Sequence, residues 1–386
     1  MRDAIDAVLA AAVDGGDVPG VAAAVVDADG AVYEGAFGVR CLGDDAAMTV
    51  DTVGTIMSMT KPVTGAAAMQ LVEQGRLDLD APAGEVVPYL RDVEVLTGFD
   101  GSTPITRRPA SPVTLRHLLT HTSGFVYDLW NRSMAKWAKI NDTPSVMSRQ
   151  LASIEVPLVF DPGERWEYGV GLDWAGMMVE AVTGQGLGEY MREHILDPLG
   201  MHDTTYAPSA EHAARAACIH QRSEDGSLVA GDFRIPGRGG FDLGGGGLFS
   251  TARDYSAFVA MLLADGAAGG IQLLMPDTVE LMAQNHMGEL RVTPLTSAAP
   301  AMSNDVDLLP DVEKSWGLSF QINEGPTPSG RPAGGLSWAG LANSYFWVDR
   351  ASGIGGVLMT QIMPFADDRA LQLFYDFERA VYDSAG

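Results

Sequence analysis

The chain has 386 residues, of which 46% are hydrophobic and 19% charged, a balance typical of a globular protein rather than a disordered one. Its formal net charge of −25 disfavours nucleic acids and anionic membrane surfaces as partners, because like charges repel. No apolar run reaches the roughly 18 residues that a membrane-spanning helix requires. The length allows two domains or one large one.

The first segment of the chain has some features of a signal peptide, but Asp3, Asp6 and Asp14 interrupt it. A helix would bring several apolar positions to one face: Ile5, Val8, Leu9, Ala12 and Val13. We therefore expect an amphipathic first helix and a cytoplasmic protein.

A hairpin and an apolar helix follow in chain order. Residues 21–28 and 31–39 have the pattern of two strands, and the Asp-Gly pair between them is a hairpin signal. The next stretch, "GTIMSMTKPVTGAAAMQLVEQG", predicts a helix that ends at Gly75, because glycine favours the position just after a helix.

Helical patterns dominate the middle of the chain. The composition of residues 97–112, "TGFDGSTPITRRPASP", predicts a loop, and Thr114 can cap the short helix after it. The clearest helices are at residues 172–184 and 187–196. Residues 243–263 combine a glycine-rich segment with a further helix.

Strand patterns return in the last quarter, at residues 344–349 and 354–361, before a final helix over about 367–383. Because strands occur at both ends of the chain and helices in between, we expect an α/β fold. It would consist of an antiparallel sheet flanked by helices, with an all-helical domain inserted.

The same pattern predicts two domains. Residues 1–62 and 240–386 would form a discontinuous α/β sandwich, and residues 63–239 a mainly helical domain. A cleft between them would be the default binding site.

The two cysteines, Cys41 and Cys218, match no metal-binding spacing. A disulfide between them is chemically possible, but a reducing cytoplasm disfavours it. We therefore expect both thiols to be unpaired.

Ser58 and Lys61 lie three residues apart, so a helix would place hydroxyl and amine on one face. Pro62 is tolerated only in a first helical turn, which puts Ser58 near the helix N-terminus, where negative charge is favoured. Lys61 is one of only four lysines and stands in an apolar segment. Desolvation would lower its pKa, so that it could accept the serine proton. The spacing alone also occurs by chance on surface helices.

Two further segments could complete such a site. Tyr168, on a loop after a Pro-Gly turn, is either a core residue with one hydrogen bond or a proton carrier. In "GGLSWAGLANSYFWVD", small residues at 339, 340 and 342 precede a strand. They would let a substrate approach the backbone, where an N–H group could bind an oxyanion.

These three elements, in this order, resemble the motifs of the serine β-lactamase and penicillin-binding protein superfamily. The likeness is closest to class C β-lactamases and family VIII carboxylesterases. Ser58-Met59-Thr60-Lys61 matches Ser-x-x-Lys, Tyr168-Gly169-Val170 stands at the tyrosine motif, and Trp338-Ala339-Gly340 stands at the Lys-Thr-Gly or His-Thr-Gly motif. The likeness runs from about residue 5 to 380 and includes "TLRHLLTHTSG", "FDPGERWEY" and "GGGGLFSTARDY".

The resemblance implies roles for these residues. Ser58 would be the acylated nucleophile, and Lys61 and Tyr168 would activate it and carry its proton to the leaving group. The backbone N–H groups of Ser58 and Leu341 would form the oxyanion hole, with Gly340 beside them. Water would then hydrolyse the acyl-enzyme, without a cofactor or metal ion.

Two departures from the family pattern bear on the substrate. Val170 replaces an asparagine whose amide holds the acyl-side amide of lactams and peptides, and Trp338 replaces a lysine or histidine that helps bind the substrate carboxylate. Both changes remove polar groups, so they favour a neutral, apolar ester. We therefore predict a carboxylesterase for short-chain or aryl carboxylic esters.

Several alternatives stay open. They are a β-lactamase, a D-amino-acid peptidase or amidase, an acyltransferase, and a non-catalytic binding protein on the same fold. The partner is expected to be a small-molecule ester, with neither nucleic acid nor membrane involved, and the protein a monomer or a homodimer.

Other motifs give weaker signals. Residues 335–339 lack the last glycine of Gly-x-Ser-x-Gly, and no His/Asp/Glu cluster has metal-binding spacing. His117 and His121 are expected to cap and pack, and Glu164 and Glu167 to lie on a solvated loop. The glycine run 244–247 lacks the lysine of a phosphate-binding loop, so it is expected to line the cleft floor. One aromatic group is equally suited to the helical core or to an apolar substrate wall: Phe125, Tyr127, Trp130 and Trp137.

Overall fold

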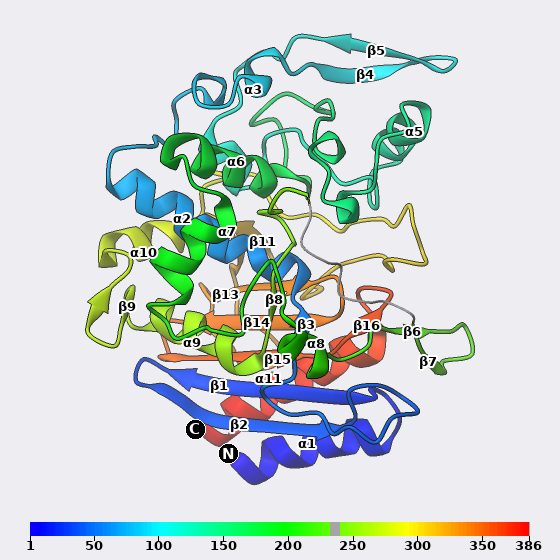
Figure 1. Cartoon of the computed structure of the whole chain (residues 1–386), viewed down its shortest axis with the longest axis vertical. Coiled ribbons are helices and arrows are strands. Elements are labelled where there is room, and N and C mark those ends of the chain that lie inside the picture. The colour runs from blue at the N-terminus through cyan, green and yellow to red at the C-terminus, as the bar shows by residue number, and fades with distance from the viewer. Residues whose placement is uncertain (232–239, 386) are drawn as a thin grey trace.

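The computed structural model describes residues 1–231 and 240–385, and a seven-stranded antiparallel sheet lies at its centre (Figure 1). The strand order is β11-β12-β13-β14-β15-β1-β2, so the N-terminal hairpin pairs with a C-terminal strand. The strands are β1 Gly20–Asp27, β2 Gly30–Gly38, β11 Lys314–Trp316, β12 Gln321–Asn323, β13 Leu336–Gly340, β14 Ser344–Asp349 and β15 Ile354–Met359. The predicted α/β fold with a sheet built from both ends is confirmed.

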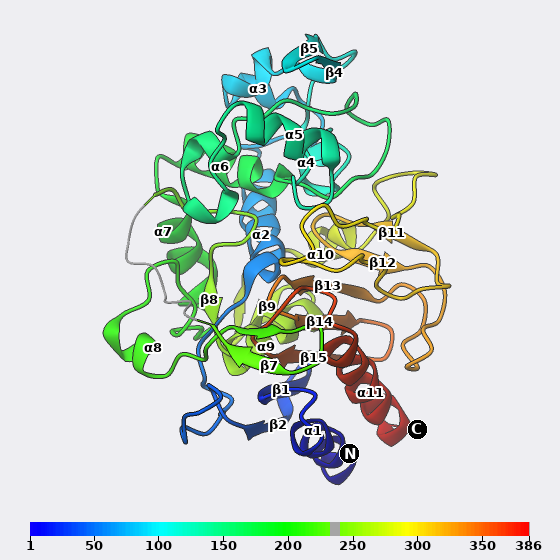
Figure 2. The ribbon, with the colours of Figure 1, turned by 90° about the vertical axis from the view of Figure 1, so that its right-hand side faces the viewer.

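Helices cover both faces of the sheet. Gly355 lies against Val259 of α9 (Ala252–Leu263), whereas the next residue, Gly356, lies against Trp347, which contacts α11 (Asp368–Ala385). Successive strand residues point to opposite faces, so α9 and α11 lie on opposite sides. Helix α1 (Arg2–Asp14) packs beside α11 and buries its predicted apolar face, which brings the two termini close together (Figures 1 and 2).

Helix α2 (Thr60–Glu73) runs between the sheet and the remaining helices, and nearly all its residues are buried (Figure 2). The other helices are α3 Tyr89–Asp92, α4 Leu115–Leu119, α5 Arg132–Ile140, α6 Gly171–Thr183, α7 Leu187–Met191 with the π-turn Arg192–Leu196, α8 Ala210–Ala214 and α10 Pro276–Met282, with 3₁₀ turns at Met57–Met59, Ala83–Glu85, Val146–Ser148 and Leu151–Ser153. Short strands are β3 Gly54–Thr55, β6 His220–Arg222, β7 Leu228–Ala230, β8 Phe249–Ser250, β9 Ala267–Ala268, β10 Ile271–Gln272 and β16 Ile362–Met363. Over the described residues, no helix combines the length and apolarity needed to cross a membrane.

One predicted domain boundary lies inside a helix, and the other borders residues that are not described. The boundary between residues 62 and 63 lies inside α2, so one continuous helix would belong to both domains. The boundary at residue 240 borders 232–239, which are outside the described residues. The division into two domains stays a prediction.

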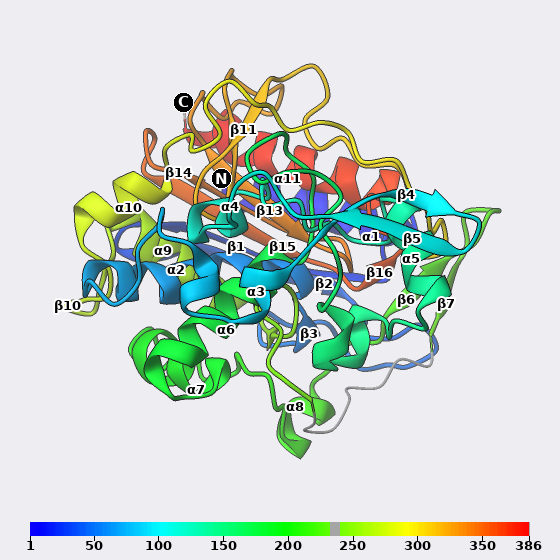
Figure 3. The same ribbon diagram turned by 90° about the horizontal axis from the view of Figure 1, so that it is seen from above.

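One local prediction was wrong and another was confirmed. Residues 97–112 were expected to form a loop, but β4 (Val95–Asp100) and β5 (Thr103–Arg107) form a hairpin that extends over the helical end (Figure 3). Most side chains of β5 are exposed or half-buried, so its composition resembles that of a loop. The small residues at 339, 340 and 342 precede the strand β14, as predicted, and the first two of them are also the last residues of β13.

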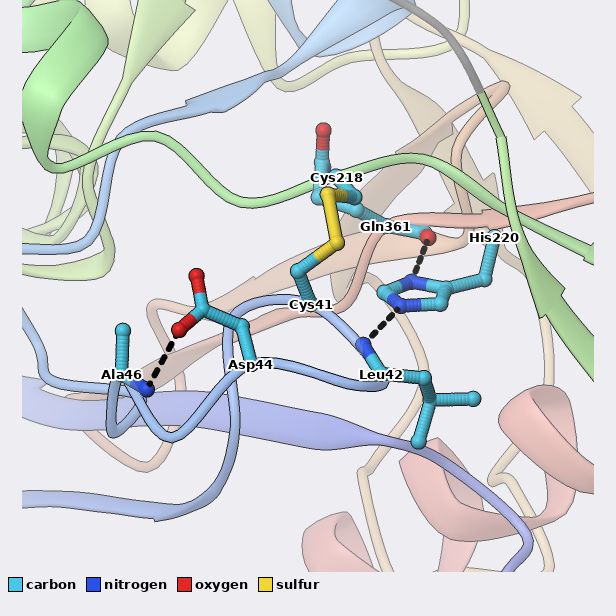
Figure 4. The surroundings of a disulfide bond; sticks show 7 residues. All are labelled: Cys41, Leu42, Asp44, Ala46, Cys218, His220 and Gln361. Carbon is cyan, nitrogen blue, oxygen red and sulfur yellow. Dashed lines mark hydrogen bonds between the residues drawn. A yellow bond between two sulfur atoms is a disulfide. The ribbon is translucent and has the colours of Figure 1, made fainter.

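The expectation of two free thiols was also wrong, because Cys41 and Cys218 form a disulfide (Figure 4). The two residues are 177 positions apart in sequence, yet their Cα atoms are 5.1 Å apart. The Leu42 N–H donates to Nε2 of His220 at 3.1 Å, and Nδ1 of His220 lies 3.2 Å from the Gln361 carbonyl oxygen. Only the tertiary fold brings the loop after β2 to the segment before β6, so spacing could not reveal this pair.

Candidate active site

Ser58 lies in a 3₁₀ turn (Met57–Met59) directly before α2 begins at Thr60. Its neighbours Met57 and Met59 are buried, whereas Ser58 itself is half-buried. Met57 has φ +45°, a left-handed conformation that is costly for a residue with a side chain. This sharp turn presents the Ser58 hydroxyl at the start of the helix, close to where the sequence predicted it.

Lys61 is fully buried, and its amine has three neighbouring oxygen atoms. Nζ donates to Ser58 Oγ at 3.1 Å, to Tyr127 Oη at 3.0 Å and to the Gly245 carbonyl oxygen at 2.7 Å. Burial lowers the Lys61 pKa well below its usual range, although the carboxylate of Asp173 opposes this shift. The amine therefore loses its proton more readily than an exposed lysine does, so it can act as a proton acceptor for Ser58.

Tyr168 interacts with Ser58 and also lies close to Lys61, because its ring centroid is 4.6 Å from Lys61 Nζ. Burial raises its pKa, and its interactions with Ser58 and Trp338 oppose that shift. Trp338, on β13, donates its Nε1–H to Tyr168 Oη at 2.9 Å. The single N–H of Trp338 is thus used to orient the tyrosine, which leaves no donor on this side chain for a substrate carboxylate.

Tyr127 is a member of the site that the sequence did not single out. It was placed in an aromatic group with two possible roles, core or substrate wall. In the fold its hydroxyl is an acceptor for Lys61, and its backbone N–H donates to the Tyr168 carbonyl at 3.1 Å. Phe125 is a core residue, whereas Tyr127 and Trp130 line the cavity beside Ser58. No local pattern distinguishes Tyr127 from its aromatic neighbours.

An apolar cavity of about 170 Å³ opens beside Ser58. It is lined by Met57, Ser58, Tyr127, Asp128, Leu129, Trp130, Ser145, Val146, Met147, Leu243, Gly245, Gly246, Met302 and Leu341. Two glycines of the run 244–247, Gly245 and Gly246, thus line the cavity. A larger hollow of about 690 Å³ lies between α1 and α11, but neither Ser58 nor Lys61 is among its lining residues. The smaller cavity is therefore the candidate active site.

Gly340 allows the end of β13 to lie directly against the segment that leads to Ser58. A Cβ atom at Gly340 would be 2.3 Å from the Ile56 carbonyl oxygen, which is a severe overlap. Leu341 follows immediately and lines the cavity together with Ser58. Ser58 and Leu341, whose backbone N–H groups are predicted to form the oxyanion hole, therefore line the same cavity.

Val170 is not in the lining of this cavity but lies close to it. It is the buried N-cap residue of α6 and is not among the described residues that line the cavity. It lines a small neighbouring pocket together with Tyr127 and Asp128, which also line the cavity. Its predicted part in substrate binding stays a prediction.

The weaker motifs occupy the places expected of them. His117 forms a reciprocal capping box with Thr114 at the start of α4. His121 is buried, with its ring centroid 4.6 Å from that of Tyr168, and burial holds its pKa well below the usual range. Glu164 and Glu167 both pair with Arg165. Within residues 1–231 and 240–385, no group of three His, Cys, Asp or Glu side chains is arranged to hold a metal ion.

Comparisons with known proteins show which family the chain belongs to. The model of the β-lactamase family matches residues 5–380. A lovastatin esterase of Penicillium rubens is 34% identical, with 98% of each chain aligned. A monacolin J acid methylbutanoyltransferase of Aspergillus terreus is 32% identical over 96% of this chain and 93% of its own. Unliganded simvastatin synthase of Aspergillus terreus superimposes with a TM-score of 0.86 at 30% identity, covering 98% of this chain and 97% of the other.

Proposed function

The chain belongs to the β-lactamase family, among its serine hydrolases and acyltransferases, and on that premise we propose that it is a carboxylesterase for neutral short-chain or aryl esters. One observation carries the proposal. The buried amine of Lys61 lies 3.1 Å from Ser58 Oγ, beside an apolar cavity. A buried amine next to a hydroxyl is an arrangement that activates a serine nucleophile.

In the proposed reaction, Ser58 Oγ attacks the ester carbon while its proton passes to neutral Lys61. The backbone N–H groups of Ser58 and Leu341 stabilise the oxyanion. Tyr168 donates its proton to the departing alkoxide and recovers one from Lys61. Water then attacks the acyl-enzyme, gives up a proton through the same groups, and releases the acid and free Ser58.

The lining of the cavity supports a neutral substrate. Its described residues include neither lysine nor arginine, and Asp128 contributes a carboxyl group. The indole N–H of Trp338 is already donated to Tyr168 Oη. A β-lactam or a peptide C-terminus carries a carboxylate that would find no positive partner among these side chains, so an ester substrate is favoured over a β-lactam.

Acyl transfer is a second candidate, favoured by the apolar cavity and by relatives that are named acyltransferases. An apolar alcohol held in the cavity would compete with water for the acyl-enzyme. Adding a series of alcohols to an ester assay distinguishes the two activities. Formation of a new ester in preference to the acid would make the protein an acyltransferase.

The cellular location, the binding partner and the oligomeric state of the protein stay predictions. A cytoplasmic location is disfavoured by the Cys41–Cys218 bond, because disulfides persist mainly in oxidising compartments. We retain the small-molecule ester as the partner, with the choice between monomer and homodimer open.

The direct test is hydrolysis of p-nitrophenyl acetate and butyrate by wild type and Ser58→Ala. We expect kcat/KM to fall by about 10³-fold or more, because the nucleophile is removed. Ser145→Ala is the matched control: Ser145 lines the same cavity, but its hydroxyl accepts from the Met147 N–H. If Ser58→Ala kept wild-type activity, or if nitrocefin were turned over faster than the esters, the proposal would be wrong.

A further inference from the structure

Asp173 is a buried carboxyl group that the proposed reaction does not use. It lies in the first turn of α6 and is 1% exposed. Its Oδ1 accepts the Gly245 N–H at 2.8 Å, whereas its buried Oδ2 has no hydrogen-bond partner among the described residues. A buried carboxylate that is only half satisfied is costly, so it calls for an explanation.

Gly245 connects Asp173 to Lys61. Its N–H is held by Asp173, and its carbonyl oxygen accepts from Lys61 Nζ at 2.7 Å. A Cβ atom at this position would lie 2.5 Å from Asp173 Oδ2 and 2.9 Å from Tyr127 Oη. Only glycine lets these oxygen atoms approach so closely, so the backbone here is fixed between α2 and α6.

Four buried groups around this pair carry no charge near neutral pH: Tyr127, Tyr168, Tyr206 and His121. Asp128, a half-buried carboxyl group whose pKa burial raises, acts on Tyr127. Burial raises the pKa values of the three tyrosines, and it lowers the pKa of the histidine well below its usual range. Burial also raises the Asp173 pKa above its usual range, and the charge of Lys61 opposes that rise. Lys61 and Asp173 are therefore the groups of this cluster that titrate together.

We propose that Asp173 is a positioning residue for Lys61: it fixes the Gly245 backbone that receives the amine, and its negative charge stabilises the ammonium form. This inference rests on the proposed function, in which Lys61 accepts the proton of Ser58. Asp173 itself takes no proton from Ser58. It sets the pH at which Lys61 changes from ammonium to free amine.

The sign of the effect follows from the charge. Loss of the carboxylate removes a stabilising partner of the ammonium, so the free amine forms at lower pH. The acid limb of kcat/KM, where Lys61 must lose its proton, then moves down. A residue with a purely structural part would lower the maximum rate and leave the position of this limb unchanged.

The test is the pH profile of p-nitrophenyl butyrate hydrolysis by Asp173→Asn, which keeps an acceptor oxygen for Gly245 but removes the charge. We expect the acid limb to move down by about one pH unit. Asp254→Asn is the matched control, because Asp254 is another buried aspartate, bonded to Thr204 and the Asp203 N–H outside the site. An unmoved limb, an upward shift, or an equal shift in the control overturns the proposal.

A second measurement titrates the wild-type protein and so does not depend on whether Asp173→Asn folds. The chain has four lysines, so the ¹³Cε signal of Lys61 can be assigned in lysine-labelled protein by comparison with Lys61→Arg. Coupling to Asp173 predicts a titration with two inflections, whereas one inflection contradicts it. If Ser58→Ala stays active, the proposed function fails; if Ser58→Ala is inactive and the titration has one inflection, only the Asp173 proposal fails.

Discussion

Two pairs of buried opposite charges differ in how their members meet. Arg331 and Glu378 are fully buried and in direct contact, with Nε 3.0 Å from Oε1. Ser329 donates to the other carboxylate oxygen of Glu378. Lys61 and Asp173 are equally buried, but the backbone of Gly245 lies between them.

The direct pair suits a structural role, whereas the separated pair suits proton transfer. An arginine keeps its charge, and a direct ion pair compensates part of the cost of burying it. When a buried lysine is held at a distance from its carboxylate, less of the cost of burying its charge is compensated. Its proton is therefore more easily lost. The first pair suits a fixed connection between a loop and α11, and the second suits proton exchange with Ser58.

The largest effect that would sharpen this comparison is expected for Lys61→Met. Removal of the amine should lower kcat/KM by about 10³–10⁴-fold, because the proton acceptor is lost. The melting temperature should rise by a few degrees, because methionine has a similar volume and needs no desolvated charge. Ester kinetics and thermal unfolding measure the two effects. A lower melting temperature would mean that the Lys61 pair stabilises the fold as the Arg331 pair does.

The second effect is expected for Glu378→Gln, which leaves the Arg331 charge buried and unpaired. Unfolding in urea should show a loss of about 3–5 kcal/mol. The activity of the folded enzyme should stay unchanged, because α11 contributes no residue to the cavity lining described here. The control is the double variant Arg331→Met/Glu378→Leu, in which no charge stays unpaired. Equal losses in the single and double variants would contradict an ion pair as the cause.

The smallest effect concerns pH and tests which buried groups set the acid limit of stability. Burial lowers the pKa values of His117, His121, His220 and His286. Below about pH 6.5 the unfolded chain binds protons that the folded chain does not, so stability falls as the pH falls. The free energy of unfolding should drop by about 1–3 kcal/mol between pH 7.5 and 5.5.

Replacing one imidazole identifies its share of this drop. His121→Asn should reduce the loss, whereas His202→Asn should not, because that side chain is 75% exposed. If stability were unchanged down to pH 5.5, the buried histidines would not set the acid limit.

Local sequence patterns determined the parts of this protein that depend on neighbours in the chain. The Asp-Gly turn of the first hairpin, the Thr114 cap and the Ser58–Lys61–Pro62 turn each depend on spacings of a few residues. Such spacings are fixed by helix and strand geometry, so they can be recognised without the fold. The family motifs extended this prediction to Tyr168 and to β13.

The tertiary structure alone decided what surrounds those residues. Tyr127 and Gly245, which accept from Lys61, are 66 and 184 positions from it, and the two cysteines are 177 apart. The pKa of a lysine depends on its desolvation and on nearby charge, and both arise from long-range packing. The sequence therefore determined which groups could react. The fold decided how close Ser58 and Lys61 lie and how readily Lys61 gives up its proton.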